Sequence, residues 1–249
     1  MDIHKPKPWH GLREFLKEYL IIVVGVLTAL AAEAGVEAWR WAERTEKTEA
    51  HLRAELSDAT VGAQAHIALE PCEYAMLAKL RQALSRPGDD WRPPYVIQVR
   101  GGIAYGVFAA PIGGFAIEGW KNAQADGTAN HFPQDEQLKF GAVYDLLAST
   151  QAAGDEQHTA VADLNSLAVP RKLDPTSRTE YLRLISRLTE SARFMATNGR
   201  LLLQQTGPLG VKRGKLEDYG PSLGVYQSVC RQFQAGQTTI VVNVPATGA

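Results

Sequence analysis

An uncharged apolar run near the N-terminus constrains this chain more than any other feature. It covers Tyr19 to Ala32, reads YLIIVVGVLTALAA, and is followed by the next aromatic side chain at Trp39. A helix needs about 20 residues to cross a hydrocarbon layer of about 30 Å, so the run alone is short. However, Tyr19 and Trp39 would lie about 30 Å apart along a helix. We therefore predict a transmembrane helix over residues 19–39.

Aromatic side chains flank this predicted span on both sides. Rings of Trp and Tyr favour the headgroup region, so we expect membrane-interface positions at Trp9, Tyr19, Trp39 and Trp41. Residues 1–18 place apolar side chains at helical spacing opposite charged ones, which is typical of a helix lying in the membrane plane. We expect residues 1–18 to form a cytoplasmic or interfacial amphipathic segment and the lipid bilayer to be a partner of the protein.

Two other interpretations of the apolar run stay open. A core helix of a soluble protein would be apolar on one face, whereas Leu20–Leu27 is apolar on every face. A cleaved signal peptide is favoured by the small-x-small triplets at Ala29–Ala31 and Ala32–Ala34. The acidic residues among the basic ones before the run argue against a cleaved signal peptide, whose first segment is positively charged. An uncleaved anchor accounts for more of these observations.

The distribution of basic residues predicts the orientation of the anchor. Four precede the span and three follow it closely: Lys5, Lys7, Arg13 and Lys17, then Arg40, Arg44 and Lys47. Positive charge is retained on the cytoplasmic side of a membrane. The small excess predicts a cytoplasmic N-terminus in the bacterial inner membrane and a periplasmic C-terminal domain.

Gly25, Ala29, Glu33 and Glu37 form a stripe at i, i+4 spacing along the predicted span. In one interpretation both acids simply reach headgroup water, because each lies in the outer third of the span. In the other, the small residues permit close contact with another helix. The stripe is then a helix-association face for a second copy or for another membrane protein.

Beyond the anchor, the sequence predicts a mainly α protein. The fold class is an N-terminal transmembrane helix continuing into a helical-bundle soluble domain, residues 40–249, with one or two short strands. We expect Pro71 to interrupt the first long helix, so that residues 72–84 fold back as a hairpin. We expect one later helix to end at Gly127, the next to run to about Ala153, a third to run from about Asp155 to Ala168, and a fourth to run from Asp174–Pro175 to as far as Leu203. Strands are expected over 95–99 and 238–244.

A second uncharged stretch covers residues 101–117. It contains five Gly and one Pro, which make a poor helix in or out of lipid. We predict a short strand beginning at Tyr95 and a loop after it, rather than a second membrane pass.

The two cysteines, Cys72 and Cys230, are too far apart in sequence for a C-x-x-C motif and too few for a metal quartet. In an oxidising periplasm they are expected to form a disulfide. The alternative is two buried thiols.

Motifs for chemistry are absent from the sequence. The six histidines include no HExxH and no pair at metal-ligand spacing, and no G-x-S-x-G nucleophile motif occurs. The formal net charge of -1 gives no field that would attract nucleic acid. We therefore predict no catalytic, cofactor or metal residues and no nucleic-acid partner.

Two blocks carry a resemblance. The first is EFLKEYLIIVVGVLTALAAE, residues 14–33, and the second is GWKNAQADGTANHFPQDEQLKFGAVYDLL, with Trp120, Gly127 and Tyr144. Together they resemble bacterial single-pass inner-membrane proteins of unknown function. The resemblance implies the same topology and no particular activity.

We expect the chain to be a membrane-anchored periplasmic helical domain with a structural, sensory or interaction role. One alternative is a membrane-tethered enzyme whose site is assembled from residues distant in sequence. Another is a subunit of a membrane complex that uses Glu33 in a helix–helix interface.

Overall fold

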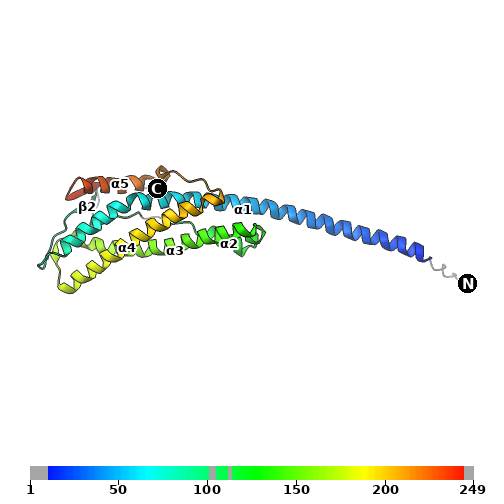
Figure 1. The fold of residues 1–249 in the computed structure, drawn as a ribbon, viewed down its shortest axis with the longest axis horizontal. Helices are drawn as coiled ribbons and strands as arrows, with labels where there is room; N and C mark the ends of the chain where they lie inside the picture. Colours follow the sequence, from blue (N-terminus) through cyan, green and yellow to red (C-terminus); the bar gives the residue numbers. More distant parts are fainter. Residues whose placement is uncertain (1–10, 101–104, 112–113, 244–249) are drawn as a thin grey trace, which may run out of the picture.

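One helix, α1, runs through almost the first third of the chain. The computed structural model describes residues 11–100, 105–111 and 114–243, and α1 covers Leu12–Leu84 without a break. Its N-terminal part projects away from the rest of the protein, and its C-terminal part lies inside a helical bundle (Figure 1). The predicted mainly α fold with a long apolar N-terminal helix is confirmed.

The expected break at Pro71 is wrong, because α1 continues through this residue. A proline removes one backbone N–H and crowds the preceding turn, but it need not end a helix whose other contacts are strong. Pro71 is exposed, so water can reach the carbonyl that loses its partner. Cys72, Met76, Leu77 and Leu80 follow immediately and are all buried. No hairpin forms, and residues 72–84 extend the same rod.

Among the described residues, four further α-helices complete the bundle. They are α2 (Glu118–Ala125), α3 (Gln134–Asn165), α4 (Pro175–Gln205) and α5 (Pro221–Gln234), with short 3-10 segments η1 (Thr128–His131), η2 (Ser166–Ala168), η3 (Gly207–Leu209) and η4 (Leu216–Tyr219). Helices α3 and α4 lie on one side of α1, and α5 lies on the other (Figure 1). Helix α2 and the start of α3 lie at the end of the bundle from which α1 projects (Figure 1).

Helix α3 also corrects an expectation. The two helices predicted on either side of Gly154 are one continuous helix, with η2 adding its last residues. Glycine weakens a helix on its own, but here it sits where α3 meets α4. A Cβ added at Gly154 would lie 3.5 Å from Cε of Met195. Packing against α4 therefore keeps the helix intact.

The start of α4 agrees with the sequence. The Asp174 carboxylate accepts hydrogen bonds from the backbone N–H groups of Thr176 and Ser177, at 2.8 and 2.9 Å, as an N-cap does. These bonds hold the pKa of Asp174 below its usual value. Helix α2 ends before Gly127, which adopts a left-handed φ of 81°.

The sequence analysis predicts no helix in the last forty residues, yet the structure has α5 there. Its signals are present: Pro221 occupies the first turn, and Leu223, Val229 and Phe233 are buried on one face. The neighbouring prediction of a strand over 238–244 is confirmed as β5 (Thr239–Val242), and Val244 lies outside the described residues.

The strands are few and short. Strand β2 (Val96–Val99) pairs parallel to β5, with Ile97 opposite Ile240, and antiparallel to β3 (Tyr105–Gly106). Strands β1 (Asp90–Trp91) and β4 (Arg171–Lys172) form a separate antiparallel pair. The sheet of β2, β3 and β5 lies at the end of the bundle far from the projecting part of α1 (Figure 1).

The buried side chains form two main clusters along the bundle. The cluster nearer the projecting part of α1 includes Leu56, Trp120, Phe132 and Phe140, and the three rings lie 5.7 to 6.0 Å apart between centroids. The far cluster joins the end of α1 to η2, α5 and the sheet, and includes Leu84, Trp91, Leu167 and Ile240. Helix α1 contributes to both clusters and is the spine of the domain.

Candidate functional site

The projecting part of α1 is long and apolar enough to cross a membrane, by length and composition. No residue in its most apolar eighteen-residue window is buried against the rest of the protein. A core helix of a soluble protein would be mostly buried there, so the structure disfavours that interpretation.

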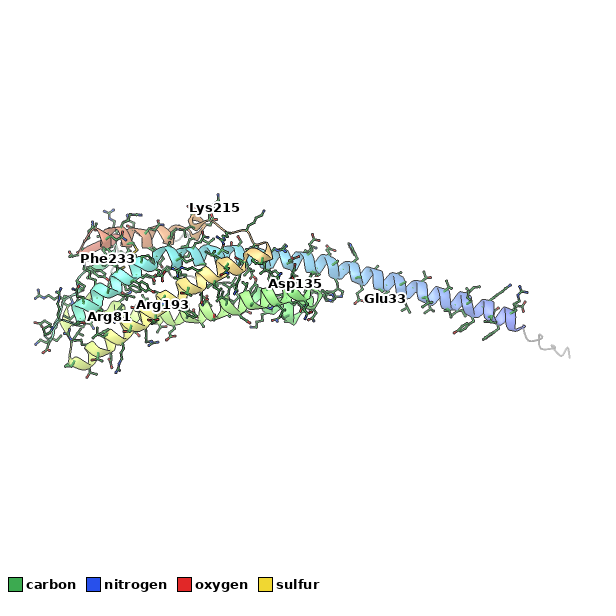
Figure 2. The ribbon with its side chains drawn as sticks, in the orientation of Figure 1. Glu33, Arg81, Asp135, Arg193, Lys215 and Phe233 are labelled. Atoms are coloured by element: carbon green, nitrogen blue, oxygen red, sulfur yellow. A yellow bond between two sulfur atoms is a disulfide. The ribbon has the colours of Figure 1, made fainter. Side chains whose placement is uncertain are left out.

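Gly25, Ala29, Glu33 and Glu37 all lie on this projecting part and are exposed. Figure 2 shows Glu33 outside the bundle. A Cβ added at Gly25 would meet no described atom within 4 Å, so the backbone is open to close approach there. The four residues lie on one helix, as predicted.

The aromatic residues at the ends of the predicted span have different surroundings. Tyr19 and Trp39 are 58% and 65% exposed, while Trp9 lies outside the described residues. Trp41 is only partly exposed, because its ring stacks on His131 of η1 with 4.0 Å between centroids. The bundle therefore begins to contact α1 directly after Trp39.

An ion pair and a cation–π contact beside this stack join α1 to the bundle. The Arg44 guanidinium lies 5.3 Å from the centroid of the Trp41 ring and donates to the Asp126 carboxylate at 2.8 Å. Hydrogen bonds from Thr128, together with Arg44, hold the pKa of Asp126 below its usual value. No pattern in the sequence indicates that Trp41 and Arg44 contact the domain.

Cys72 of α1 and Cys230 of α5 form a disulfide, with an S–S distance of 2.12 Å and Cα atoms 5.8 Å apart. The predicted pairing is confirmed. Cys72 is 5% exposed, so the bond is built into the core between the two helices.

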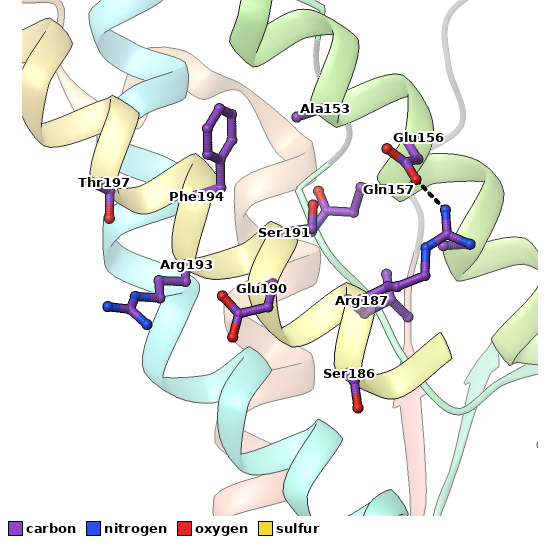
Figure 3. Close-up of a pocket in the computed structure, with 12 residues that line it drawn as sticks. Ala153, Glu156, Gln157, Ser186, Arg187, Glu190, Ser191, Arg193, Phe194 and Thr197 are labelled. Atoms are coloured by element: carbon purple, nitrogen blue, oxygen red, sulfur yellow. Dashed lines mark hydrogen bonds and ion pairs between the residues drawn. The ribbon is translucent and has the colours of Figure 1, made fainter. Parts of the chain in front are cut away.

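A cavity of about 660 Å³ opens between α3 and α4. Its walls combine apolar side chains with polar ones. Ala153 and Ala160 of α3 face Leu188 and Phe194 of α4, and Phe194 is 42% exposed. Figure 3 shows the cavity with Phe194 on α4 and the Arg187–Glu156 ion pair that joins the two helices. Such a space accepts an apolar group between charged edges.

Two polar side chains of this cavity have atoms without partners. Gln157 is 4% exposed, and its Nε2 atom makes no hydrogen bond to any described residue. The Oγ atom of Ser191, across the helix pair, is buried and likewise unpaired among the described residues. A buried donor without an acceptor costs about 1 to 3 kcal/mol. The cavity therefore keeps hydrogen-bonding capacity at the expense of stability.

The charges at the edges of the cavity balance. Arg187 is paired with Glu156, and Glu190 and Arg193 on α4 add one charge of each sign. The cavity consequently favours a ligand by its shape and hydrogen-bonding groups more than by its net charge.

Gln157 was not singled out in the sequence, although a signal existed. Val143, Leu147, Thr150, Gln157, Val161 and Leu164 are buried positions of α3 that recur every three, four or seven residues. A glutamine in such a series is a polar residue at a core position, which calls for either a partner or a function.

A second cavity, of about 380 Å³, contains His66 together with the carboxyl groups of Glu55, Asp58 and Asp218. A histidine that acts as a general base is oriented by a partner. Burial alone lowers the pKa of His66 to about 4, and its ring makes no hydrogen bond to any of these carboxylates among the described residues. The residues share a cavity without forming a catalytic pair.

Within the described ranges, no group of three or more His, Cys, Asp or Glu side chains is arranged to hold a metal ion. Comparisons with protein-family models, with curated proteins and with solved structures each found no match. The class that the fold defines is therefore a mainly α domain on one candidate membrane helix, and function has to be inferred from its own residues.

Proposed function

We propose that the protein is a membrane-tethered binding domain of the bacterial inner membrane. Residues 19–39 span the bilayer, the N-terminus is cytoplasmic, and residues 40–249 act in the periplasm in a sensory or interaction role. The observation that carries this proposal is the apolar part of α1, which is exposed along its length and continues without a break into a folded domain. Exposed apolar surface of this extent calls for lipid or protein around it.

The disulfide supports the periplasmic side. Disulfides form and persist in oxidising compartments and are rare in the cytosol. The Cys72–Cys230 bond closes a long loop within the domain and lies in its core. The basic residues on the N-terminal side of the span agree with this orientation.

The cavity between α3 and α4 supports a binding role. Its apolar walls suit the apolar body of a ligand or a partner side chain, and the unpaired Gln157 amide and Ser191 hydroxyl both can donate a hydrogen bond. Both unpaired atoms are buried behind the cavity surface, so the apolar walls are what a ligand would contact first. Polar groups retained at a cost in stability are typical of sites selected for binding.

Reporter fusions at the C-terminus test the topology. We expect an alkaline phosphatase fusion to be active and a cytosol-dependent fluorescent protein fusion to be dark, because the fusion point follows the periplasmic domain. Phosphatase fused after Arg13, before the span, is the control and should be inactive.

Two results would contradict this topology. One is a bright C-terminal fluorescent fusion with an inactive phosphatase. The other is full-length protein that stays in the supernatant when lysate is centrifuged at high speed without detergent.

Replacing Gln157 with leucine tests the cavity. We expect Gln157→Leu to raise the free energy of unfolding by about 1 kcal/mol, because it removes a buried donor without a partner. Urea denaturation of the full-length protein in lipid nanodiscs measures this. Gln151→Leu is the matched control on the same helix: Gln151 accepts from the Phe115 N–H at 2.6 Å and donates to Asp155 at 2.8 Å.

The control variant should lose stability, since it leaves a backbone N–H unpaired. If both variants lose stability to the same extent, the Gln157 amide is satisfied in the folded protein and the cavity loses its main support as a binding site.

A further inference from the structure

The cavity that contains His66 has a composition unlike that of the α3–α4 cavity. Glu55, Asp58 and His66 line it from one face of α1, where their spacing brings them into a row. Phe115 lines it from the segment before α2, and Asp218 and Tyr219 line it from η4. Segments far apart in sequence thus enclose about 380 Å³.

The charge of this lining is of one sign. Three carboxyl groups are present, and no lysine or arginine is among the described residues that line the cavity. Asp218 accepts a hydrogen bond from the backbone N–H of Lys215 at 3.0 Å, which leaves its charge uncompensated. Glu55 accepts from the Tyr144 hydroxyl at 2.7 Å, and its Oε1 atom lies 3.9 Å from Nε2 of His51. Walls that carry several carboxylates and no basic side chain attract a cation.

Aromatic rings complete the walls. The Phe115 ring contacts Gly62 so closely that an added Cβ would lie 3.0 Å from its Cε1 atom, and its centroid is 6.4 Å from that of His66. Tyr219, which is partly buried, also lines the cavity. Faces of aromatic rings favour organic cations.

An unpaired polar group in the same place can accept an N–H donor. His66 is 4% exposed and lines the cavity, and its ring makes no hydrogen bond to a described residue. Burial keeps it neutral at pH 7 by lowering its pKa to about 4, so one ring nitrogen is an acceptor.

We propose that this cavity binds a primary ammonium ion attached to a small apolar body. The carboxylates of Glu55, Asp58 and Asp218 supply the negative field, the Phe115 and Tyr219 rings contact the apolar part, and His66 accepts one N–H. The site is separate from the α3–α4 cavity and does not depend on the orientation of the protein in the membrane. A metal ion is a poorer occupant, because no metal-binding cluster occurs among the described side chains.

Calorimetric titration of the full-length protein in nanodiscs tests this proposal, with empty nanodiscs as the blank. The probes are phenethylammonium and 3-phenylpropanoate, which share an apolar body and carry opposite charges. We expect the ammonium to bind at pH 7, more weakly as salt is added, and the carboxylate not to bind.

Asp58→Asn should weaken phenethylammonium binding about fivefold, because it removes one carboxylate at the exposed rim. Glu217→Gln is the matched control, because it also replaces one carboxylate with an amide. Glu217 is on η4, is exposed, and does not line the cavity. It should leave the affinity unchanged.

Three results would overturn the proposal. They are no binding of phenethylammonium above the blank, equal binding of the two probes, and an equal loss of affinity in the Asp58 and Glu217 variants. Both substitutions are at exposed positions, so circular dichroism is expected to show an unchanged fold in each.

Discussion

Replacing Cys72 and Cys230 together with alanine is expected to lower the free energy of unfolding by about 5 kcal/mol. The bond closes a loop with a sequence separation of 158 residues, and the chain entropy that such a loop removes from the unfolded state corresponds to this value. Urea denaturation in nanodiscs under oxidising conditions measures the difference between the native protein and the variant.

A reductant provides the internal control for this experiment. It should lower the stability of the native protein towards that of the double variant and have no effect on the variant itself. Equal stability of the two proteins without reductant would mean that the bond between α1 and α5 contributes nothing to the fold.

Glu73 is expected to make stability fall as the pH rises. Its side chain is 2% exposed and its Oε1 atom has no hydrogen-bond partner among the described residues. Burial, and secondarily the charge of Glu70, raises the pKa of Glu73 to about 8 from an ordinary value of 4.5. The folded state therefore holds a proton that the unfolded state releases.

The sign follows from this difference. Below pH 4.5 both states are protonated and Glu73 costs nothing; between pH 4.5 and about 8 stability declines, and above about 8 the loss is complete. The full loss is on the order of 5 kcal/mol. Glu73→Gln should remove this decline and be the more stable protein at pH 8.5, as measured by urea denaturation from pH 5 to pH 9.

Glu180→Gln, at an exposed position of α4, is the control and should keep the native pH profile. A Glu73→Gln variant with the same decline between pH 5 and pH 8 as the native protein would show that another group causes it.

The features that could be predicted from the sequence are those with strong local signals. The apolar run before Trp39 gave the projecting helix, and Asp174 followed by Pro175 gave the start of α4 to the residue. The disulfide was predicted from compartment and cysteine count alone, and the structure places Cys72 and Cys230 together.

The errors came where packing outweighs local preference. Pro71 and Gly154 both weaken an isolated helix, yet both lie inside continuous helices because their neighbours are buried against other elements. Such contacts join residues distant in sequence and leave no local pattern.

The two cavities differ in whether the sequence contains a pattern that indicates them. Gln157 interrupts a regular series of core positions in α3, so its position could have been noticed. The acidic cavity could not, since Asp58, Phe115 and Asp218 come from three separate segments and each looks like an ordinary surface or core residue in sequence. Their proximity is a product of the tertiary fold.

The unbroken course of α1 has a mechanical consequence. A helix of 73 residues is about 110 Å long, and the Arg44–Asp126 ion pair and the disulfide join it to the bundle near the two ends of its packed part. No hinge separates the two. In the proposed topology, rotation of the helix about its axis would therefore rotate the whole bundle with it.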